Sequence, residues 1–218
     1  SEMHPPRTMG ATRIDGNACG AAVEAALAER IAALPSPPHL AVVIVGDDPA
    51  SHVYVGAKER ACARLGIRST RIDIAADAEY AEVVATVQRL NADPDVNGIL
   101  VQSPLPSGMD EIAITDLIDP IKDVDGFHAQ NLGRLVQGDA SGLLPCTPAG
   151  VMRMLEWAEV DLSGKRAVVI GRSRIVGMPQ SLLLAQKGAD ATVTIAHSRT
   201  ADMAALCREA DVIIAAVG

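Results

Sequence analysis

The sequence predicts an α/β protein with two domains, each containing a mainly parallel sheet. Three observations support this fold class. Short, continuous apolar segments alternate with segments of helical periodicity. At 218 residues, the chain is long for one compact unit and suits two. Its 49% hydrophobic content includes only one Trp, two Tyr and one Phe, so aliphatic side chains must form the cores.

The first half of the chain alternates helices with strands. Helices are expected over 18–34, 50–65 and 80–91, and strands over 40–45, 69–74 and 98–101. Asp47-Asp48-Pro49 supplies an N-cap and a first-turn proline for the second helix, which Gly66 ends. The strand over 40–45 is apolar throughout, which predicts that both of its faces are covered, as in parallel sheets.

The second half repeats this rhythm after a segment rich in turn residues. Residues 104–148 should contain the active-site loops and the domain junction, with Thr147 capping a helix over 148–158. Strands are then expected over 166–170, 191–196 and 212–217, and helices over 177–187 and 201–210. This predicts an N-terminal α/β domain over 1–147, a Rossmann-like domain over 148–218, and a cleft between them.

Charge and cysteine usage exclude several classes of protein. The net charge of −8, without any run of Lys or Arg, argues against a nucleic-acid partner. The four cysteines are widely spaced, which argues against a zinc site or a disulfide framework and favours a reducing, cytoplasmic compartment. Because Ser1–Pro6 lacks a signal-peptide core and no segment is long enough to span a membrane, we expect a soluble protein.

A glycine-containing turn follows the strand over 166–170 and reads Gly171-Arg172-Ser173-Arg174-Ile175-Val176-Gly177. Glycines at both ends let a backbone approach a pyrophosphate at the N-terminus of the next helix. Ser173 replaces the second glycine of the usual dinucleotide motif, and a purely structural turn is the alternative. The pattern therefore suggests a dinucleotide site without establishing one.

The end of the next strand bears on cofactor preference. It reads His197-Ser198-Arg199, and the first acidic residue is Asp202. NAD-preferring units usually carry an acid here, whereas a guanidinium and a hydroxyl suit the 2′-phosphate of NADP. The segment favours NADP, with Arg172 as a second phosphate contact. The alternative is that Arg199 is an ordinary surface cation.

Four polar residues of the first domain are candidates for chemistry. Tyr54 and Lys58 lie at i and i+4 on a helix that follows a strand, so their side chains share a face. There, Lys58 can act as a general acid or base and Tyr54 can stack on a heterocycle. A solvated lysine beside a half-buried tyrosine is the alternative.

Gln102 and Asp125 complete the set, and each is also compatible with an ordinary loop role. Gln102 directly follows the strand over 98–101, and Asp125 lies in a turn-forming segment. Asp123 and Asp125 together suggest a cation site, but further carboxylates at calcium-loop spacing are missing. We therefore expect no metal.

Taken together and in order, these segments resemble the methylenetetrahydrofolate dehydrogenase/cyclohydrolase family. The resemblance extends from about Gly10 to Gly218. Its segments are Val45–Ser51 with Tyr54 and Lys58, Gly98–Pro106, Lys122–Phe127, Pro145–Pro148, Gly171–Pro179 and His197–Thr200. Each motif is weak alone, but six in the right order are specific.

The resemblance implies an NADP-dependent enzyme of one-carbon folate metabolism, connected to purine biosynthesis and usually homodimeric. It would oxidise 5,10-methylenetetrahydrofolate to 5,10-methenyltetrahydrofolate and hydrolyse that product to 10-formyltetrahydrofolate. Lys58 would be the acid/base of hydrolysis and Gln102 would orient it. Tyr54 would stack on the folate and Asp125 would hydrogen-bond the pterin.

The sequence departs from the family at its end and at Ser103, where the family usually has a bulkier apolar residue. The family continues beyond Gly218 with further strands, a glycine-rich loop and a C-terminal helix, so a chain ending there should be a weak dehydrogenase at best. Two other functions remain alternatives: a shikimate-type dehydrogenase of two domains, and a non-catalytic nucleotide- or folate-binding protein.

Overall fold

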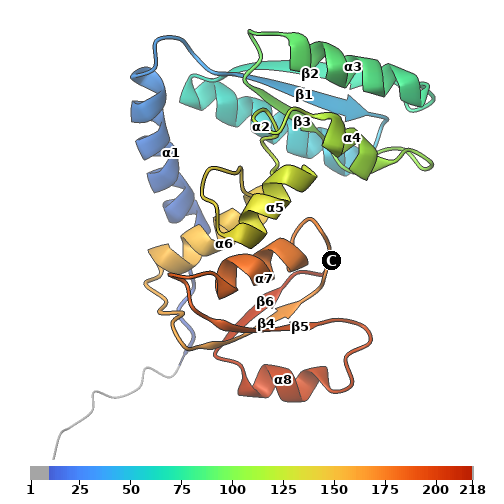
Figure 1. The fold of residues 1–218 in the computed structure, drawn as a ribbon. Helices are drawn as coiled ribbons and strands as arrows, with labels where there is room; N and C mark the ends of the chain where they lie inside the picture. Colours follow the sequence, from blue (N-terminus) through green and yellow to red (C-terminus); the bar gives the residue numbers. More distant parts are fainter. Residues whose placement is uncertain (1–9, 218) are drawn as a thin grey trace, which may run out of the picture.

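The structure, a computed structural model, describes residues 10–217 and contains two three-stranded parallel sheets (Figure 1). Ser1–Pro6 and Gly218 lie outside the described residues. The strand orders are β2-β1-β3 and β5-β4-β6, so each sheet has its first strand in the centre. The predicted α/β class with parallel sheets is confirmed.

The first sheet consists of β1 (His39–Val45), β2 (Arg68–Ile74) and β3 (Gly98–Val101). In its register, Val43 of β1 lies beside Ile72 of β2 and Val101 of β3. Every β1 residue after its first two is buried, which confirms the prediction that both faces of this strand are covered.

Helices cover both faces of this sheet. On one face, α2 (Pro49–Leu65) packs through Val55 against Val42 and Ile44. The opposite face packs against α3 (Tyr80–Ala92) through Val83 and Val87. In each case the alternating side chains of β1 supply the sheet's contribution to the core.

The local signals around α2 act as predicted. The Asp48 carboxylate accepts a hydrogen bond from the Ser51 backbone N–H at 2.9 Å, and Pro49 occupies the first turn. At the other end, Gly66 adopts φ +77°, the left-handed conformation that favours glycine. These caps fix the helix that carries two candidate site residues.

Two short helices were not predicted within the turn-rich segment. The first, α4 (Glu111–Leu117), is capped by the Asp110 carboxylate, which accepts from the Ala113 N–H at 3.0 Å. The second, α5 (Ala129–Gln137), ends at Gly138 in a left-handed conformation. Each is too short to display helical periodicity clearly, although both carry recognisable end signals.

The expected capping role of Thr147 is wrong. Helix α6 (Cys146–Trp157) begins before this residue, and the Ala149 N–H donates to the Pro145 carbonyl at 3.0 Å. Thr147 therefore already lies in the first helical turn, where its side chain is exposed. The chain enters α6 without a side-chain cap.

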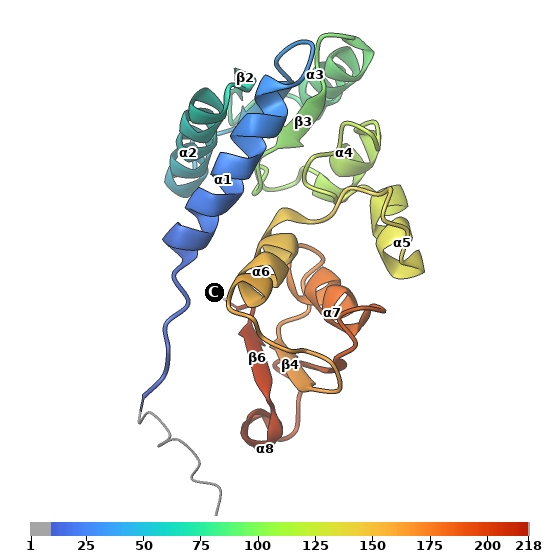
Figure 2. The same ribbon diagram turned by 90° about the vertical axis from the view of Figure 1, so that its left-hand side faces the viewer.

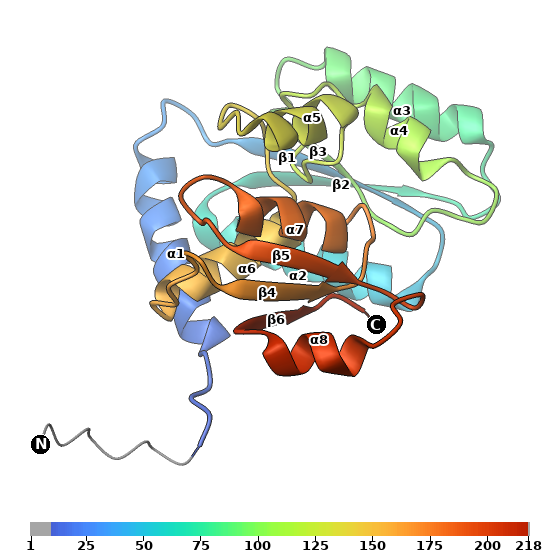
Figure 3. The same ribbon diagram turned by 60° about the horizontal axis from the view of Figure 1, so that its bottom comes forward.

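The second sheet consists of β4 (Arg166–Ile170), β5 (Thr192–Ala196) and β6 (Val212–Ala215). Figure 3 shows α7 (Gly177–Ala185) and α8 (Met203–Glu209) on opposite sides of these strands. The core lies between the sheet, α6 and α7; its buried residues are Leu155, Leu162, Ala167, Val169 and Leu184.

Helices also connect the two halves. The long α1 (Gly16–Ala32) runs beside α2 and contacts α6 (Figure 2). The Gln186 side chain after α7 donates to the Leu135 carbonyl of α5 at 2.8 Å. Among residues 10–217, no helix combines the length and apolar character needed to cross a membrane.

Candidate active site

Lys58 and Gln102 meet at the carboxyl end of the first sheet. The Lys58 Nζ of α2 donates to the Gln102 Oε1 at 2.8 Å. Gln102 directly follows β3 and its backbone N–H donates to the Val43 carbonyl at 2.9 Å, so its position is fixed by the sheet. Its Nε2 donates to the Ser103 carbonyl at 3.1 Å, which orients the side-chain oxygen toward Lys58.

Asp125 lies within electrostatic reach of Lys58. Burial raises the pKa of Asp125 to about 6; the Lys58 ammonium opposes this shift and the Asp123 carboxylate adds to it. A parallel bridge between Ile99 and Asp123 places the segment containing Asp125 beside β3. The carboxyl group can therefore change its protonation state near neutral pH.

Asp123 supports the turn rather than forming a metal site. It is fully buried, and its Oδ2 accepts from the His128 N–H at 2.8 Å and the Asn131 Nδ2 at 2.9 Å. Within residues 10–217, no group of three or more His, Cys, Asp or Glu side chains has an arrangement that could hold a metal ion. The structure brings Asp125 toward Lys58 through this internally bonded turn.

Cys146 is a member of the site that the sequence argument did not select. Its Sγ donates to the Val124 carbonyl at 3.3 Å. Burial raises the pKa of the Cys146 thiol, the Asp125 carboxylate adds to the increase, and Lys58 opposes it. Cys146 thus lies beside Lys58 and Asp125, and its place in Pro145-Cys146-Thr147-Pro148 was the available signal.

Tyr54 lies one turn before Lys58 on α2, as the spacing predicted. Its side chain is 57% exposed, which leaves an aromatic surface available at the edge of the site. Lys58 is partly buried and hydrogen-bonded rather than freely solvated. The alternative of a freely solvated lysine therefore does not describe Lys58, whereas the exposure of Tyr54 is close to the half-buried tyrosine of that alternative.

The turn between β4 and α7 requires its two glycines. Gly171 has φ +119°, and a side chain there would collide with the Ala216 carbonyl. At Gly177, a side chain would collide with the Gly171 carbonyl. The Ser173 hydroxyl accepts from the Val176 N–H at 3.1 Å, and no side chain caps α7.

Cationic and polar groups gather where β4 and β5 end. An Arg172 guanidinium nitrogen lies 3.4 Å from the His197 Nε2, and Ser198 and Arg199 are exposed on the segment that follows β5. Asp202 is used as the cap of α8, where it accepts from the Ala205 N–H at 3.0 Å. This edge therefore suits an anionic group.

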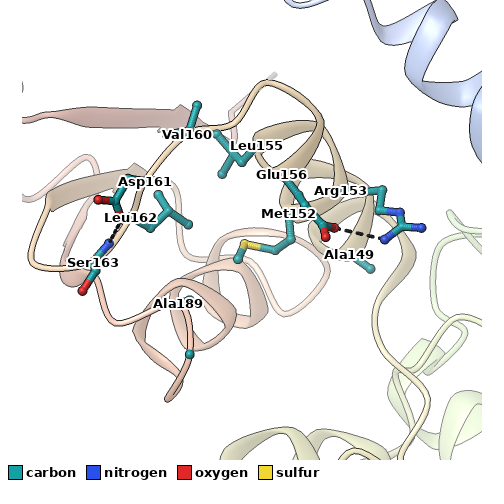
Figure 4. A pocket seen from close by; sticks show the side chains of 11 residues that line it. Ala149, Met152, Arg153, Leu155, Glu156, Val160, Asp161, Leu162, Ser163 and Ala189 are labelled. Atoms are coloured by element: carbon teal, nitrogen blue, oxygen red, sulfur yellow. Dashed lines mark hydrogen bonds and ion pairs between the residues drawn. The ribbon is translucent and has the colours of Figure 1, made fainter.

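Two cavities of similar volume differ in whether site residues line them. A largely apolar cavity of about 420 Å³ includes Lys58 and Cys146 in its wall. A cavity of about 450 Å³ beside α6 contains none of the predicted site residues (Figure 4). There, Arg153 pairs with Glu156 at 3.0 Å and the Asp161 carboxylate accepts from the Ser163 N–H at 3.1 Å, so these polar groups satisfy one another.

Two domain models of one protein family match this chain, the first in its N-terminal part and the second in its C-terminal part. The profile of the tetrahydrofolate dehydrogenase/cyclohydrolase catalytic domain matches residues 14–125. The profile of the NAD(P)-binding domain of the same family matches residues 145–218.

Relatives and solved structures match over nearly the whole chain. It is 54% identical to the bifunctional protein FolD of Parasynechococcus marenigrum over 212 residues, covering 95% of the chain and 71% of the relative. It is 55% identical to that of Acidiphilium cryptum over 210 residues, with 96% and 74% covered.

The FolD crystal structure from Campylobacter jejuni superposes with a TM-score of 0.92 at 44% identity, covering 95% of this chain and 74% of that one. The Trypanosoma brucei enzyme, solved with NADP and an inhibitor, gives 0.90 at 36% identity, with 95% and 72% covered. Since both halves match the same family, in sequence and in structure, this chain belongs to the tetrahydrofolate dehydrogenase/cyclohydrolase family.

Proposed function

We propose that the protein oxidises 5,10-methylenetetrahydrofolate with NADP⁺ and hydrolyses the resulting 5,10-methenyltetrahydrofolate to 10-formyltetrahydrofolate. The observation that carries this proposal is the 2.8 Å contact between Lys58 Nζ and Gln102 Oε1, with the partly buried Asp125 close to Lys58. A lysine held by an amide can manage protons, and the neighbouring domain offers a dinucleotide-type turn. The family supplies the identity of the substrate.

The turn between β4 and α7 and the end of β5 fit a bound dinucleotide. The close approach of Gly171 and Gly177 leaves no room for a side chain at either position, and α7 presents its uncapped N-terminus. We assign its binding to Gly171, Arg172, Ser173, Gly177, Ser198 and Arg199. When bound, NADP⁺ supplies the hydride acceptor for the oxidation.

The exposed cations set the preference between cofactors in this proposal. Arg172 and Arg199 would bind a 2′-phosphate, while the nearest acid, Asp202, is committed to α8. The chain's contribution to oxidation is to hold the folate against the first sheet and the dinucleotide against the second, since hydride transfer mainly requires alignment of two rings.

Hydrolysis depends on the groups of the first sheet. Water adds to the methenyl carbon. The bond from that carbon to N5 then breaks as N5 takes up a proton, and the added hydroxyl loses its remaining proton to solvent as it becomes the formyl carbonyl. Lys58 accepts a proton from the attacking water and returns one to the departing nitrogen, while Gln102 holds its amine in place. Tyr54 stacks on the folate and Asp125 hydrogen-bonds the pterin.

Three further proposals concern organisation. We place the domain division after Thr147, supported by the packing of α6 against α7. We also propose a homodimer, the state that the family resemblance implies, and sedimentation velocity tests it. The third proposal is a cytoplasmic role in purine biosynthesis, which the formyl group of the product supports. Cell fractionation tests the location, and growth with and without added purines tests the role.

The function is tested by supplying methylenetetrahydrofolate with NADP⁺ or NAD⁺ and following reduced cofactor and folate products separately. We expect NADPH and 10-formyltetrahydrofolate, with little methenyltetrahydrofolate remaining. NAD⁺ should give a lower kcat/KM than NADP⁺. An active preparation that prefers NAD⁺ would contradict the cofactor assignment, and a folded protein without either activity would contradict the function.

A further inference from the structure

We propose that Glu111 and Arg174 are positioning residues that hold the substrate-side and cofactor-side loops in one fixed arrangement. Arg174 Nη2 lies 3.3 Å from Glu111 Oε2. Glu111 is the first residue of α4, whereas Arg174 belongs to the turn between β4 and α7. This Glu111–Arg174 bridge therefore joins the two halves of the molecule beside the proposed active site.

On the substrate side, Glu111 holds the segment that follows Gln102. The two oxygens of its carboxylate lie 3.3 and 3.1 Å from the Ser103 hydroxyl, which donates to them. The Leu105 backbone N–H donates to the same carboxylate. Gln102 donates a hydrogen bond to the Ser103 carbonyl and also orients Lys58. A well-ordered segment after Gln102 therefore helps to hold the Gln102 side chain in place.

On the cofactor side, Arg174 makes a second contact across the boundary. Its guanidinium carbon lies 5.5 Å from the centroid of the Phe127 ring, a distance suited to a cation–π interaction. Phe127 is two residues after Asp125, so the arginine contacts the turn that carries the proposed pterin ligand. Arg174 thus connects the Gly171–Gly177 turn to two substrate-side segments.

The Glu111–Arg174 bridge is partly shielded from solvent. The side chains of Arg174 and Glu111 are 31% and 27% exposed, so the pair is less screened than a fully exposed ion pair. A cavity of about 20 Å³ remains between the loops, room for about one water molecule. The loops are therefore packed against one another at the bridge.

The consequence rests on the proposed function. Hydride transfer needs the folate on one half and the dinucleotide on the other, so it depends on how the two loops are spaced. Hydrolysis uses Lys58 and Gln102, which both lie on the first half. Loss of the bridge should therefore slow hydride transfer more than hydrolysis.

The test compares Arg174→Ala, Glu111→Gln and the double variant with wild type in both reactions. Hydrolysis is measured separately by supplying methenyltetrahydrofolate directly. For Arg174→Ala we expect the kcat of hydride transfer to fall about tenfold, with KM for NADP⁺ changing less and hydrolysis retaining at least about half its rate. Arg174→Lys should recover part of the loss, because it retains the charge without the planar stack.

The double variant and a control variant distinguish coupling between Glu111 and Arg174 from a nonspecific loss of activity. If the two residues act through each other, the double variant should be about as slow as Arg174→Ala alone. Arg153→Ala is the matched control, because it removes a 3.0 Å arginine–glutamate pair confined to α6. It should leave both activities unchanged.

A measurement without turnover tests the same coupling. Hydrogen–deuterium exchange of the peptide containing Leu105 should be faster in Arg174→Ala than in wild type, although Arg174 lies in the other half. Unchanged exchange, or equal losses in both reactions, would overturn the bridge as a positioning device. A wild type that lacks both activities but shows the exchange effect would instead refute the proposed function and retain the coupling.

Discussion

The two sheets share one strand arrangement but present different chemistry at their carboxyl ends. The first sheet brings together partly buried groups that hold or share protons, namely Lys58, Gln102 and Asp125. The second ends in a turn closed by glycines, with exposed cations next to it. The same β-α-β architecture therefore supports proton management on one side and anion binding on the other.

This difference is also the reason why we propose a site between the two halves. A partly buried carboxyl with a raised pKa and a restrained lysine can bind and activate a heterocycle, but they offer no redox group. The glycine-closed turn can hold a dinucleotide, but it offers no acid or base positioned for hydrolysis. The two reactions require both ends to face one shared space.

The largest expected effect follows removal of the proton-handling group. Lys58→Ala should lower hydrolysis of supplied methenyltetrahydrofolate by about 100-fold or more, because the general acid/base is lost. Lys187→Ala, which changes an exposed lysine beyond α7, is the matched control and should retain the wild-type rate. A Lys58→Ala enzyme with normal hydrolysis would show that another group moves the proton.

A side chain in the cofactor turn should produce the next largest effect. Gly177→Ala would place a methyl group against the Gly171 carbonyl, so the turn must shift. We expect kcat/KM for NADP⁺ to fall about 30- to 100-fold, since small displacements at a reacting centre are costly. Gly150→Ala is the control, because an added side chain at that helical glycine meets nothing within 4 Å. Equal cofactor kinetics in both variants would contradict the assigned turn.

Charge removal at the end of β5 should have a smaller and more selective effect. Arg199→Ala should raise KM for NADP⁺ by about tenfold while changing KM for NAD⁺ little, because only NADP⁺ has a 2′-phosphate to lose its charged partner. Steady-state kinetics with both cofactors measures this selectivity. A similar change with both would assign Arg199 a structural role.

The smallest effect concerns pH. The pKa of Asp125 is raised to about 6 by burial, so the folded protein holds this proton more tightly than the unfolded chain. The resulting stability is fully present below the ordinary carboxyl pKa near 4 and is lost as pH rises to about 6. Between about pH 4 and pH 6, the free energy of unfolding of wild type should therefore decrease by about 2 kcal/mol relative to that of Asp125→Asn. Urea unfolding at each pH measures this difference.

The same titration should appear in substrate binding. An ionised Asp125 accepts hydrogen bonds from the pterin, so KM for folate should increase as pH falls below about 6. In Asp125→Asn, this inflection should disappear, whereas Asp116→Asn should retain it. A wild-type profile without an inflection near pH 6 would show that Asp125 does not contact the substrate.

The prediction of the fold from sequence succeeded where local signals were strong. Asp48, Pro49 and Gly66 delimit α2 as their chemistry requires, and in the strand predicted over 40–45 every residue from Ala41 to Val45 is buried as expected. It failed at α4 and α5, whose seven and nine residues are too few to reveal a helical repeat. The start of α6 was misplaced because Pro145 precedes the helix without a side-chain cap.

For the site, sequence spacing placed Tyr54 and Lys58 on one helix, but it could not give the Lys58–Gln102 contact. That contact joins residues 44 positions apart and depends on how β3 pairs with β1. Cys146 and the Glu111–Arg174 bridge were missed for the same reason, since their partners lie in distant segments. Tertiary packing, rather than any local pattern, determines these contacts.

The most direct test of the division between the sheets measures Lys58→Ala and Gly177→Ala side by side in both reactions. Hydride transfer is followed with saturating folate, and hydrolysis is followed with supplied methenyltetrahydrofolate and no cofactor. We expect reciprocal losses, with Lys58→Ala accumulating the methenyl intermediate and Gly177→Ala hydrolysing it at nearly the wild-type rate. Parallel losses of both activities in both variants would contradict the assignment of separate chemistry to the two sheets.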